Sequence, residues 1–266
     1  MMFEKYMTSI VFKKGSEIVE FYFRVDHMHE KLIKALNVFD RFGIKLLSIN
    51  SYVDYTFTPT LPRGGGGVFV FADFTNVNVK VEDFVRELES AINSEVYYSK
   101  SPVKGFMADE LAFPIYIFPE IRSIILHEKG VQGMIKGLYE KLGDTAAVFL
   151  YHMAYSGGWF LGEYFSKKLG LRGRDLLVET LKFYQASGWG RVELVEYKPL
   201  LMRIVLRLYD SFECEAFRCS DRPASQFIRG HISGLISALL NSNIRVIETK
   251  CIAKGDDFCE FIAEKF

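Results

Sequence analysis

The sequence predicts an α+β protein that is divided into two domains. Residues 1–100 alternate strand-like and helix-like segments, whereas residues 118–266 run through several helices before their first strands. Between these parts, residues 101–117 contain Pro and Gly, carry charges of both signs and show no apolar period. A chain of 266 residues is long enough for two domains of ordinary size.

The first domain is expected to follow the order β-α-β-β-α-β. Residues 18–25 (IVEFYFRV) are β-branched and aromatic, which favours a strand. Residues 29–42 place apolar side chains at helical spacing and stop at Gly43, which predicts a helix. The same criteria predict strands at 44–53, 68–74 and 95–99, a helix at 81–92, and an extra strand near Ile10.

Within this domain, the run LIKALNVFDRFGIKLLSI resembles the ACT-like domains of the ferredoxin-like group, in which a helix leads through Gly-Ile into the second strand. The resemblance implies a ferredoxin-like βαββαβ sheet. We therefore expect an ACT-like domain at 1–100, a linker at 101–117 and a second domain at 118–266.

The second domain is expected to combine helices with an antiparallel sheet. Helices are predicted at 131–142, 145–169, 175–186 and 224–240, and strands at 191–197, 201–209, 245–251 and 258–263. Residues 145–162 contain no Asp, Glu, Lys or Arg, but they include a histidine and three glycines and reach only the short limit for crossing a bilayer. We expect this segment to be a buried helix.

The overall composition excludes several classes of protein. The 33 basic and 33 acidic residues cancel, so net charge gives no indication of a nucleic-acid or membrane partner. Four cysteines are too few for a disulfide scaffold. The N-terminal residues lack the basic, apolar and small-residue order of a signal peptide, so a cytoplasmic protein is expected.

The predicted helix 224–240 carries small residues along one side. Gly230, Ser233, Gly234 and Ser237 recur at helical spacing. This helix is therefore expected to approach a neighbouring element closely.

The end of the chain carries a candidate metal site. Glu248, Cys251 and Cys259 lie close in sequence, and Cys214 and Cys219 lie upstream. Structural Zn²⁺ takes four such donors in a tetrahedron. Because side chains alternate along a strand, Glu248 and Cys251 can share a ligand only if the strand bulges or ends near Cys251. A site with three protein ligands and a water, or buried cysteines without metal, are the alternatives.

The run RGHISGLISALL, followed by E-x-x-C-x-x-x-G-x-x-x-C-x-F, resembles the vinyl-4-reductase (4VR) domain, which occurs in the sensory part of aromatic-responsive transcription activators. The resemblance implies the helix-plus-antiparallel-sheet fold of TRAPP subunits. It also implies homodimers and an apolar pocket for a small molecule between the helices and the sheet.

The resemblance further implies a zinc ligand set of Cys, Glu, Cys and Cys. This chain has Ser225 at the position of the first cysteine, and we expect a cysteine from the preceding segment to loop back in its place. Four protein ligands leave no open position, so the zinc would be structural. The expected ligands are Cys219, Glu248, Cys251 and Cys259, with Cys214 in reserve.

The pocket implied by the resemblance needs aromatic walls with a few polar groups. The candidate lining residues are His152, Tyr155, Trp159, Tyr184, Trp189 and Phe217.

These features favour a ligand-binding regulatory protein over an enzyme. The chain has no dinucleotide-binding glycine motif and no assignable nucleophile with its base. We expect a sensor that binds a small hydrophobic or aromatic molecule, acts in transcription regulation and signals through a protein partner that the sequence does not identify. An adaptor that uses the fold for protein contacts and a reductase of a vinyl group are the alternatives.

Overall fold

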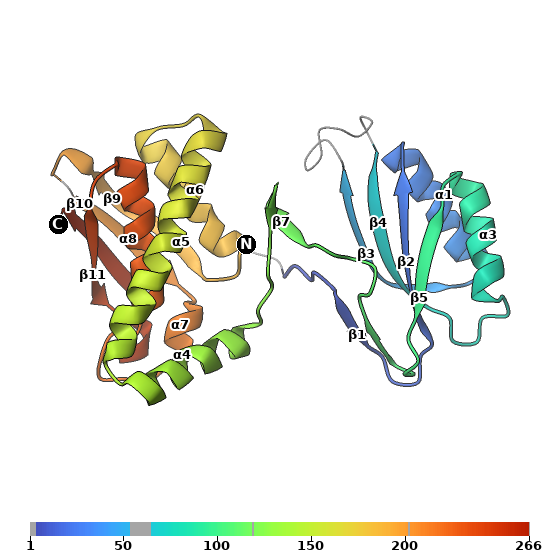
Figure 1. Ribbon diagram of the computed structural model, residues 1–266, viewed down its shortest axis with the longest axis horizontal. Coiled ribbons are helices and arrows are strands. Elements are labelled where there is room, and N and C mark those ends of the chain that lie inside the picture. The colour runs from blue at the N-terminus through green and yellow to red at the C-terminus, as the bar shows by residue number, and fades with distance from the viewer. Residues whose placement is uncertain (1–3, 54–64, 119, 202, 266) are drawn as a thin grey trace. The chain divides into compact units, whose positions relative to one another are not determined.

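The computed structural model describes residues 4–53, 65–118, 120–201 and 203–265 (Figure 1). The chain divides into two compact units, Met1–Ile125 and Leu126–Phe266. The predicted linker contains β6 (Phe106–Ala108), which pairs antiparallel with β1 (Ile10–Phe12), so this part of the linker belongs to the first unit. A small hairpin of β7 (Tyr116–Phe118) and β8 (Ile121–Arg122) follows.

The first unit has the ferredoxin-like arrangement that the sequence predicts. Its elements are β2 (Ile18–Val25), α1 (Met28–Arg41), β3 (Lys45–Val53), β4 (Gly66–Asp73), α3 (Val81–Ile92) and β5 (Val96–Lys100). The strands form one antiparallel sheet in the order β3-β4-β2-β5. Both helices cover one face of the sheet (Figure 1), where Phe21, Phe39 and Phe84 are fully buried in the core.

The strand β4 begins at Gly66, earlier than the predicted residue 68, because two glycines let it pass close to β3. A Cβ atom on Gly66 would lie 2.0 Å from the carbonyl oxygen of Tyr52, and one on Gly67 would lie 2.6 Å from the Tyr52 ring. A larger residue at either position would force the two strands apart.

The second unit is an α+β domain, as predicted. Its helices are α4 (Glu128–Leu142), α5 (Thr145–Leu169), α6 (Gly173–Ala186), α7 (Phe212–Glu215) and α8 (Gln226–Leu240). Its strands are β9 (Arg191–Lys198), β10 (Arg203–Tyr209), β11 (Ile244–Lys250) and β12 (Cys259–Lys265), with short 3₁₀ turns η1 (Pro199–Leu201) and η2 (Ile252–Lys254). The sheet is antiparallel in the order β11-β12-β10-β9.

Helix α8 packs against the sheet, and α5 packs along α8 (Figure 1). The two helices are in backbone contact. A Cβ atom on Gly158 would lie 1.9 Å from the carbonyl oxygen of His231, and one on Gly234 would lie 2.0 Å from that of Tyr155. The predicted close approach of the small-residue side of α8 is therefore confirmed, and its neighbour is α5.

The charge-free residues 145–162 are part of α5, so the predicted helix is confirmed. One side is buried through Leu150, Ala154 and Leu161, and the opposite side is exposed. Within the described residues, no helix combines the length and apolar character needed to cross a membrane.

Candidate metal centre and aromatic cluster

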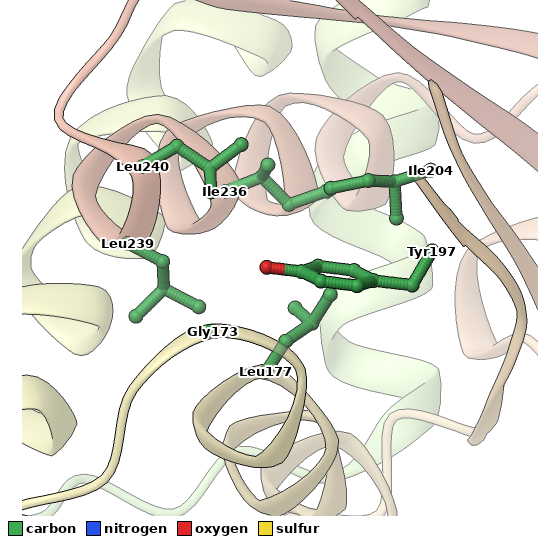
Figure 2. A pocket seen from close by; sticks show the side chains of 7 residues that line it. All are labelled: Gly173, Leu177, Tyr197, Ile204, Ile236, Leu239 and Leu240. Atoms are coloured by element: carbon green, nitrogen blue, oxygen red, sulfur yellow. The ribbon is translucent and has the colours of Figure 1, made fainter. Parts of the chain in front are cut away.

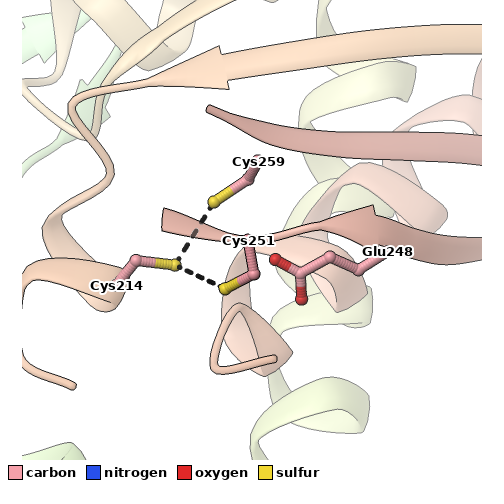
Figure 3. Close-up of side chains that lie close together, drawn as sticks. All are labelled: Cys214, Glu248, Cys251 and Cys259. Atoms are coloured by element: carbon pink, nitrogen blue, oxygen red, sulfur yellow. Dashed lines mark hydrogen bonds between the residues drawn. The ribbon is translucent and has the colours of Figure 1, made fainter. Parts of the chain in front are cut away.

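Three separate parts of the second unit bring four candidate ligands together at one end of its sheet (Figure 3). Glu248 lies on β11, Cys251 directly follows that strand, and Cys259 begins β12. Cys259 pairs with Leu208 on β10, and the chain leaves β10 for α7, which carries Cys214. The group therefore links the ends of three strands to a short helix.

The four side chains have the spacing of a metal site. Their ligand atoms all lie within 4.8 Å of one another. The Cys214 sulfur is 3.6 Å from the Cys251 sulfur and 3.4 Å from the Cys259 sulfur, and all three cysteines are fully buried. Tetrahedral zinc with Zn–S bonds of about 2.3 Å places its sulfurs about 3.8 Å apart. The group can therefore hold such an ion with small adjustments.

The bulge that the sequence requires is present. The β11–β12 register shifts between Glu248 and Lys250, so two residues of β11 oppose one step of β12. The shift changes the alternation of side chains along β11. Glu248 and Cys251 consequently point to the same place, and this prediction is confirmed.

Backbone amides are aimed at two of the sulfurs. The Ala224 amide donates to the Cys251 sulfur and the Ile252 amide donates to the Cys259 sulfur, both at 3.4 Å. Such donors favour the thiolate form, which is the form that binds metal. Gly255, at a φ of 99°, allows the turn between the two cysteines.

The Glu248 carboxylate is incompletely satisfied by the protein. One of its oxygens accepts a hydrogen bond from the Ser225 hydroxyl at 2.7 Å. The other oxygen is buried and has no hydrogen-bond partner among the described residues. A buried acceptor without a partner carries a free-energy cost that a bound cation would remove.

Four acidic groups in so small a space cannot all ionise alone. Burial, followed by the neighbouring Cys251, raises the pKa of Glu248 to about 9. The pKa of Cys251 is lowered by hydrogen bonds from Cys214 and Cys259, whereas the hydrogen bond with Cys251 raises the pKa of Cys214 to about 12. The protein by itself therefore stabilises one thiolate, and a divalent cation would allow the other groups to ionise.

The structure brings Cys214, and not the expected Cys219, to the other three ligands. Cys219 is exposed, has a φ of 67° and lies outside the group. The neighbouring Glu213 explains the difference, because its buried carboxylate accepts the amides of Phe227 and Ile228 at 2.9 Å. This contact holds α7 against the start of α8, so Cys214 fills the fourth position.

The Ser225 side chain also lies within the group. Its hydroxyl oxygen is 2.9 Å from the Cys214 sulfur. The position where the resemblance implies a cysteine is therefore at the site, but the sulfur comes from Cys214.

The six predicted pocket residues do not meet at one place. Tyr155 and Trp159 lie one turn apart on α5 with their ring centroids 6.3 Å apart, and Phe217 packs on Tyr139. His152 is exposed on α5.

Tyr184 and Trp189 do meet, and they surround His231, which the sequence analysis did not single out. The Tyr184 hydroxyl is 2.8 Å from Nδ1 of His231, and the Trp189 ring centroid is 4.9 Å from that of His231. Phe183 stacks on the imidazole at 5.8 Å. His231 belongs to the run RGHISG, so its place on a small-residue helix was the available signal.

Burial lowers the pKa of His231 to about 4. The imidazole is therefore neutral near pH 7. The result is a neutral polar pair, Tyr184 and His231, enclosed by aromatic rings, with Phe212 and Phe227 packed on Trp189 at the edge. We call the four residues Phe183, Tyr184, Trp189 and His231 the aromatic cluster.

A small pocket lies elsewhere between the helices and the sheet (Figure 2). Its empty volume is about 220 Å³, below the roughly 300–1,000 Å³ usual for drug-sized ligands. The Tyr197 hydroxyl points into an apolar lining. The lining residues are Gly173, Leu177, Tyr197, Ile204, Ile236, Leu239 and Leu240.

Comparison with known proteins identifies the part of the chain that holds the candidate ligands. Residues 204–265 match the family model of the vinyl-4-reductase (4VR) domain. The second unit contains a 4VR domain. The matched residues include all four metal-site side chains and His231, whereas Tyr184 and Trp189 precede them.

Relatives of this 4VR-containing chain occur among archaeal proteins and bacterial regulators. The chain is 30% identical over 103 residues to the uncharacterized protein MJ1642 of Methanocaldococcus jannaschii, covering 39% of this chain and 60% of that protein. It is 27% identical over 159 residues to the phenol regulator MopR of Acinetobacter guillouiae, covering 55% of this chain and 28% of the regulator. The chain therefore spans well under the full length of both relatives.

The fold of the 4VR unit is also that of a solved sensory domain. The phenol-responsive sensory domain of the transcription activator PoxR, solved with phenol, superposes with a TM-score of 0.51 at 21% sequence identity. The superposition covers 56% of this chain and 79% of that domain.

Proposed function

We propose that this protein is a sensor whose 4VR domain binds a small aromatic molecule, and that a structural zinc ion holds the domain together. The observation that carries the proposal is the buried Tyr184–His231 pair inside an aromatic cluster. Two similar proteins support it, because MopR is a phenol regulator and the PoxR domain is phenol-responsive.

The aromatic cluster supplies the contacts that a ring bearing a hydroxyl group requires. Phe183 and Trp189 offer ring faces and edges, and aromatic pairs gain about 0.5–1.5 kcal/mol beyond the burial of their area. Tyr184 and His231 offer a hydroxyl and a neutral imidazole, so a bound hydroxyl can both donate and accept a hydrogen bond. Neither group is charged near pH 7, which favours a neutral ligand over an ionic one.

The ligand proposal is tested by thermal unfolding of the full chain with phenol, catechol, benzene and an isoprenoid alcohol. A ligand at 100 times its Kd stabilises a protein by about 2.7 kcal/mol. We expect phenol or catechol to raise the unfolding temperature more than benzene does. If none of these compounds shifts the transition, the sensor proposal fails.

Two single-hydroxyl deletions locate the ligand. Tyr184→Phe removes one hydrogen bond in the aromatic cluster and is expected to weaken phenol binding about 10-fold, corresponding to about 1.4 kcal/mol. Tyr197→Phe removes the hydroxyl of the pocket in Figure 2 and serves as the matched control. Weakening by Tyr197→Phe alone would move the ligand to that pocket and contradict the placement in the cluster.

We further infer that the proposed zinc is held by Cys214, Glu248, Cys251 and Cys259. The close sulfurs, the amides directed at two of them and the partnerless Glu248 oxygen all fit this ion. Bound zinc would cross-link α7 to the ends of β11 and β12. Four protein ligands leave no position for a substrate, so the role is structural.

Elemental analysis of protein purified without chelator tests the metal. We expect one zinc per chain in the unmodified protein and in Cys219→Ser, because Cys219 is exposed and outside the group. Cys214→Ser should lose most of the zinc and unfold at a lower temperature. Equal zinc content in the two variants would exclude Cys214 as a ligand.

A further inference from the structure

The side of α5 that points away from α8 is both apolar and exposed. Val148, Phe149, Met153 and Phe160 are between 51% and 59% exposed. No charged residue lies between Thr145 and Gly162, so this side has none of the charged groups that normally solvate a helix surface. An apolar surface of this kind marks an interaction site.

The exposed residues have the spacing of a helix–helix seam. Phe149, Met153, Ser156 and Phe160 follow one another at intervals of four, three and four residues. This is the a/d spacing of a heptad, which keeps the side chains on one stripe facing a partner helix. We call these four residues the outer seam of α5, because the buried Leu150, Ala154 and Gly158 face α8.

The outer seam is complementary to itself. In an antiparallel pair of identical helices, residues equally far from a common midpoint lie opposite each other. The midpoint between positions 154 and 155 pairs Phe149 with Phe160 and Met153 with Ser156. The same midpoint pairs the exposed His152 with the exposed Gly157. A flexible side chain and an imidazole thus each meet a small residue, and the two phenylalanine positions meet each other.

We propose that the outer seam is the interface of a homodimer in which α5 of one chain packs antiparallel on α5 of the other. A large apolar side chain buries about 150–250 Å² when it is fully enclosed, so four half-exposed side chains offer roughly 400 Å² per chain. Two copies contribute roughly 800 Å² before flanking residues are counted, which approaches the 1,200–2,000 Å² of a stable interface. The self-complementary order of residues selects a second copy of this chain over a different partner. The proposal does not depend on the ligand or the metal.

The mass of the full chain in solution tests the interface. We expect light scattering to give about 61 kDa, twice the 30.6 kDa of one chain. The double variant Phe149→Glu/Phe160→Glu should raise the dissociation constant by at least roughly 100-fold, because it places two charges opposite each other in each half of the seam. Leu200→Glu, which changes a 98% exposed leucine on η1, is the matched control and should remain dimeric. Far-UV circular dichroism confirms that each variant is folded.

Cross-linking tests the register independently of these charges. In a Cys219→Ser background, Met153→Cys/Ser156→Cys should form dimers with a short bifunctional maleimide. Phe149→Cys/Ser156→Cys should not, because no two of its cysteines lie opposite each other. A monomer at all concentrations, a dimer that survives the double glutamate variant, or equal cross-linking of the two pairs would overturn the proposal.

Discussion

The contact between α5 and α8 predicts that a single methyl group at Gly234 destabilises the second unit. The Cβ atom of Gly234→Ala would lie 2.0 Å from the Tyr155 carbonyl oxygen, whereas real Cβ contacts do not fall below 3.0 Å. The obstacle is backbone, so no side-chain rotation relieves it, and the helices must separate by about 1 Å. Separation loosens the packing along α5 and around His231, which neighbours Gly158 across the same contact.

Two opposing effects set the magnitude. Overpacking of a core costs about 1–3 kcal/mol, and the rigid obstacle places Gly234→Ala at the upper end of this range. Alanine also favours a helix over glycine by about 1 kcal/mol. We therefore expect a net loss of about 2 kcal/mol in the free energy of unfolding, or roughly 4–8 °C in melting temperature.

A matched substitution on α4 isolates the steric effect. Gly133→Ala is also in a helix, but its Cβ atom would have no neighbour within 4 Å. The same helix preference should raise its stability by up to about 1 kcal/mol. Trp159 and Trp189, the two tryptophans of the chain, both lie in the second unit, so urea unfolding followed by tryptophan fluorescence reports on that unit. If Gly234→Ala were as stable as Gly133→Ala, the close approach of the helices would be refuted.

Further predictions concern titration and metal removal. Because burial lowers the pKa of His231 to about 4 from about 6.5 in the unfolded chain, the folded state binds fewer protons between these values. Stability is then complete above pH 6.5 and falls by about 3 kcal/mol as the pH drops through this window. Urea unfolding at several pH values should show that His231→Leu loses this dependence; an unchanged slope would place the histidine in water. Burial raises the pKa of Asp73, but hydrogen bonds from Lys13, Thr75 and Ser16 outweigh it and lower the pKa to about 2. The first unit should therefore keep this contribution above about pH 4 and lose it as the pH falls through 2, and Asp73→Asn should lower its melting temperature at pH 7, measured by calorimetry. A strong chelator should lower the melting temperature of the second unit, and added Zn²⁺ should restore it; an unchanged melting temperature in a metal-free sample would show that the ion is not structural.

Local patterns predicted most of the secondary structure. The helix at Val81–Ile92 and the strand at Ile18–Val25 have the predicted bounds, because their apolar periods are regular over several turns or pleats. The four-residue α7 is too short to show a period, and the loop or strand end expected at Cys214 is a helix. The strand β6 has three residues and is recognised only through its pairing with β1.

The candidate site divides in the same way. The bulge beside Glu248 was predictable, because strand alternation alone forbids Glu248 and Cys251 from facing one ligand. The choice between Cys214 and Cys219 was not, since it depends on Glu213 binding the first amides of α8. The residues of the aromatic cluster were only partly predictable, because Tyr184 and His231 meet across 47 positions of the chain.

The sequence by itself determined the two-part organisation, the α+β class, the side of α8 that approaches a neighbour and three of the four candidate metal ligands. Each of these follows from residues that are near one another in the chain, where backbone periodicity fixes direction and spacing. The tertiary structure alone decided that Cys214 completes the group, that His231 is the centre of the aromatic cluster and that α5 buries one apolar side while exposing another. Those outcomes depend on contacts between distant segments, whose distances are set by packing in three dimensions and not by separation along the chain.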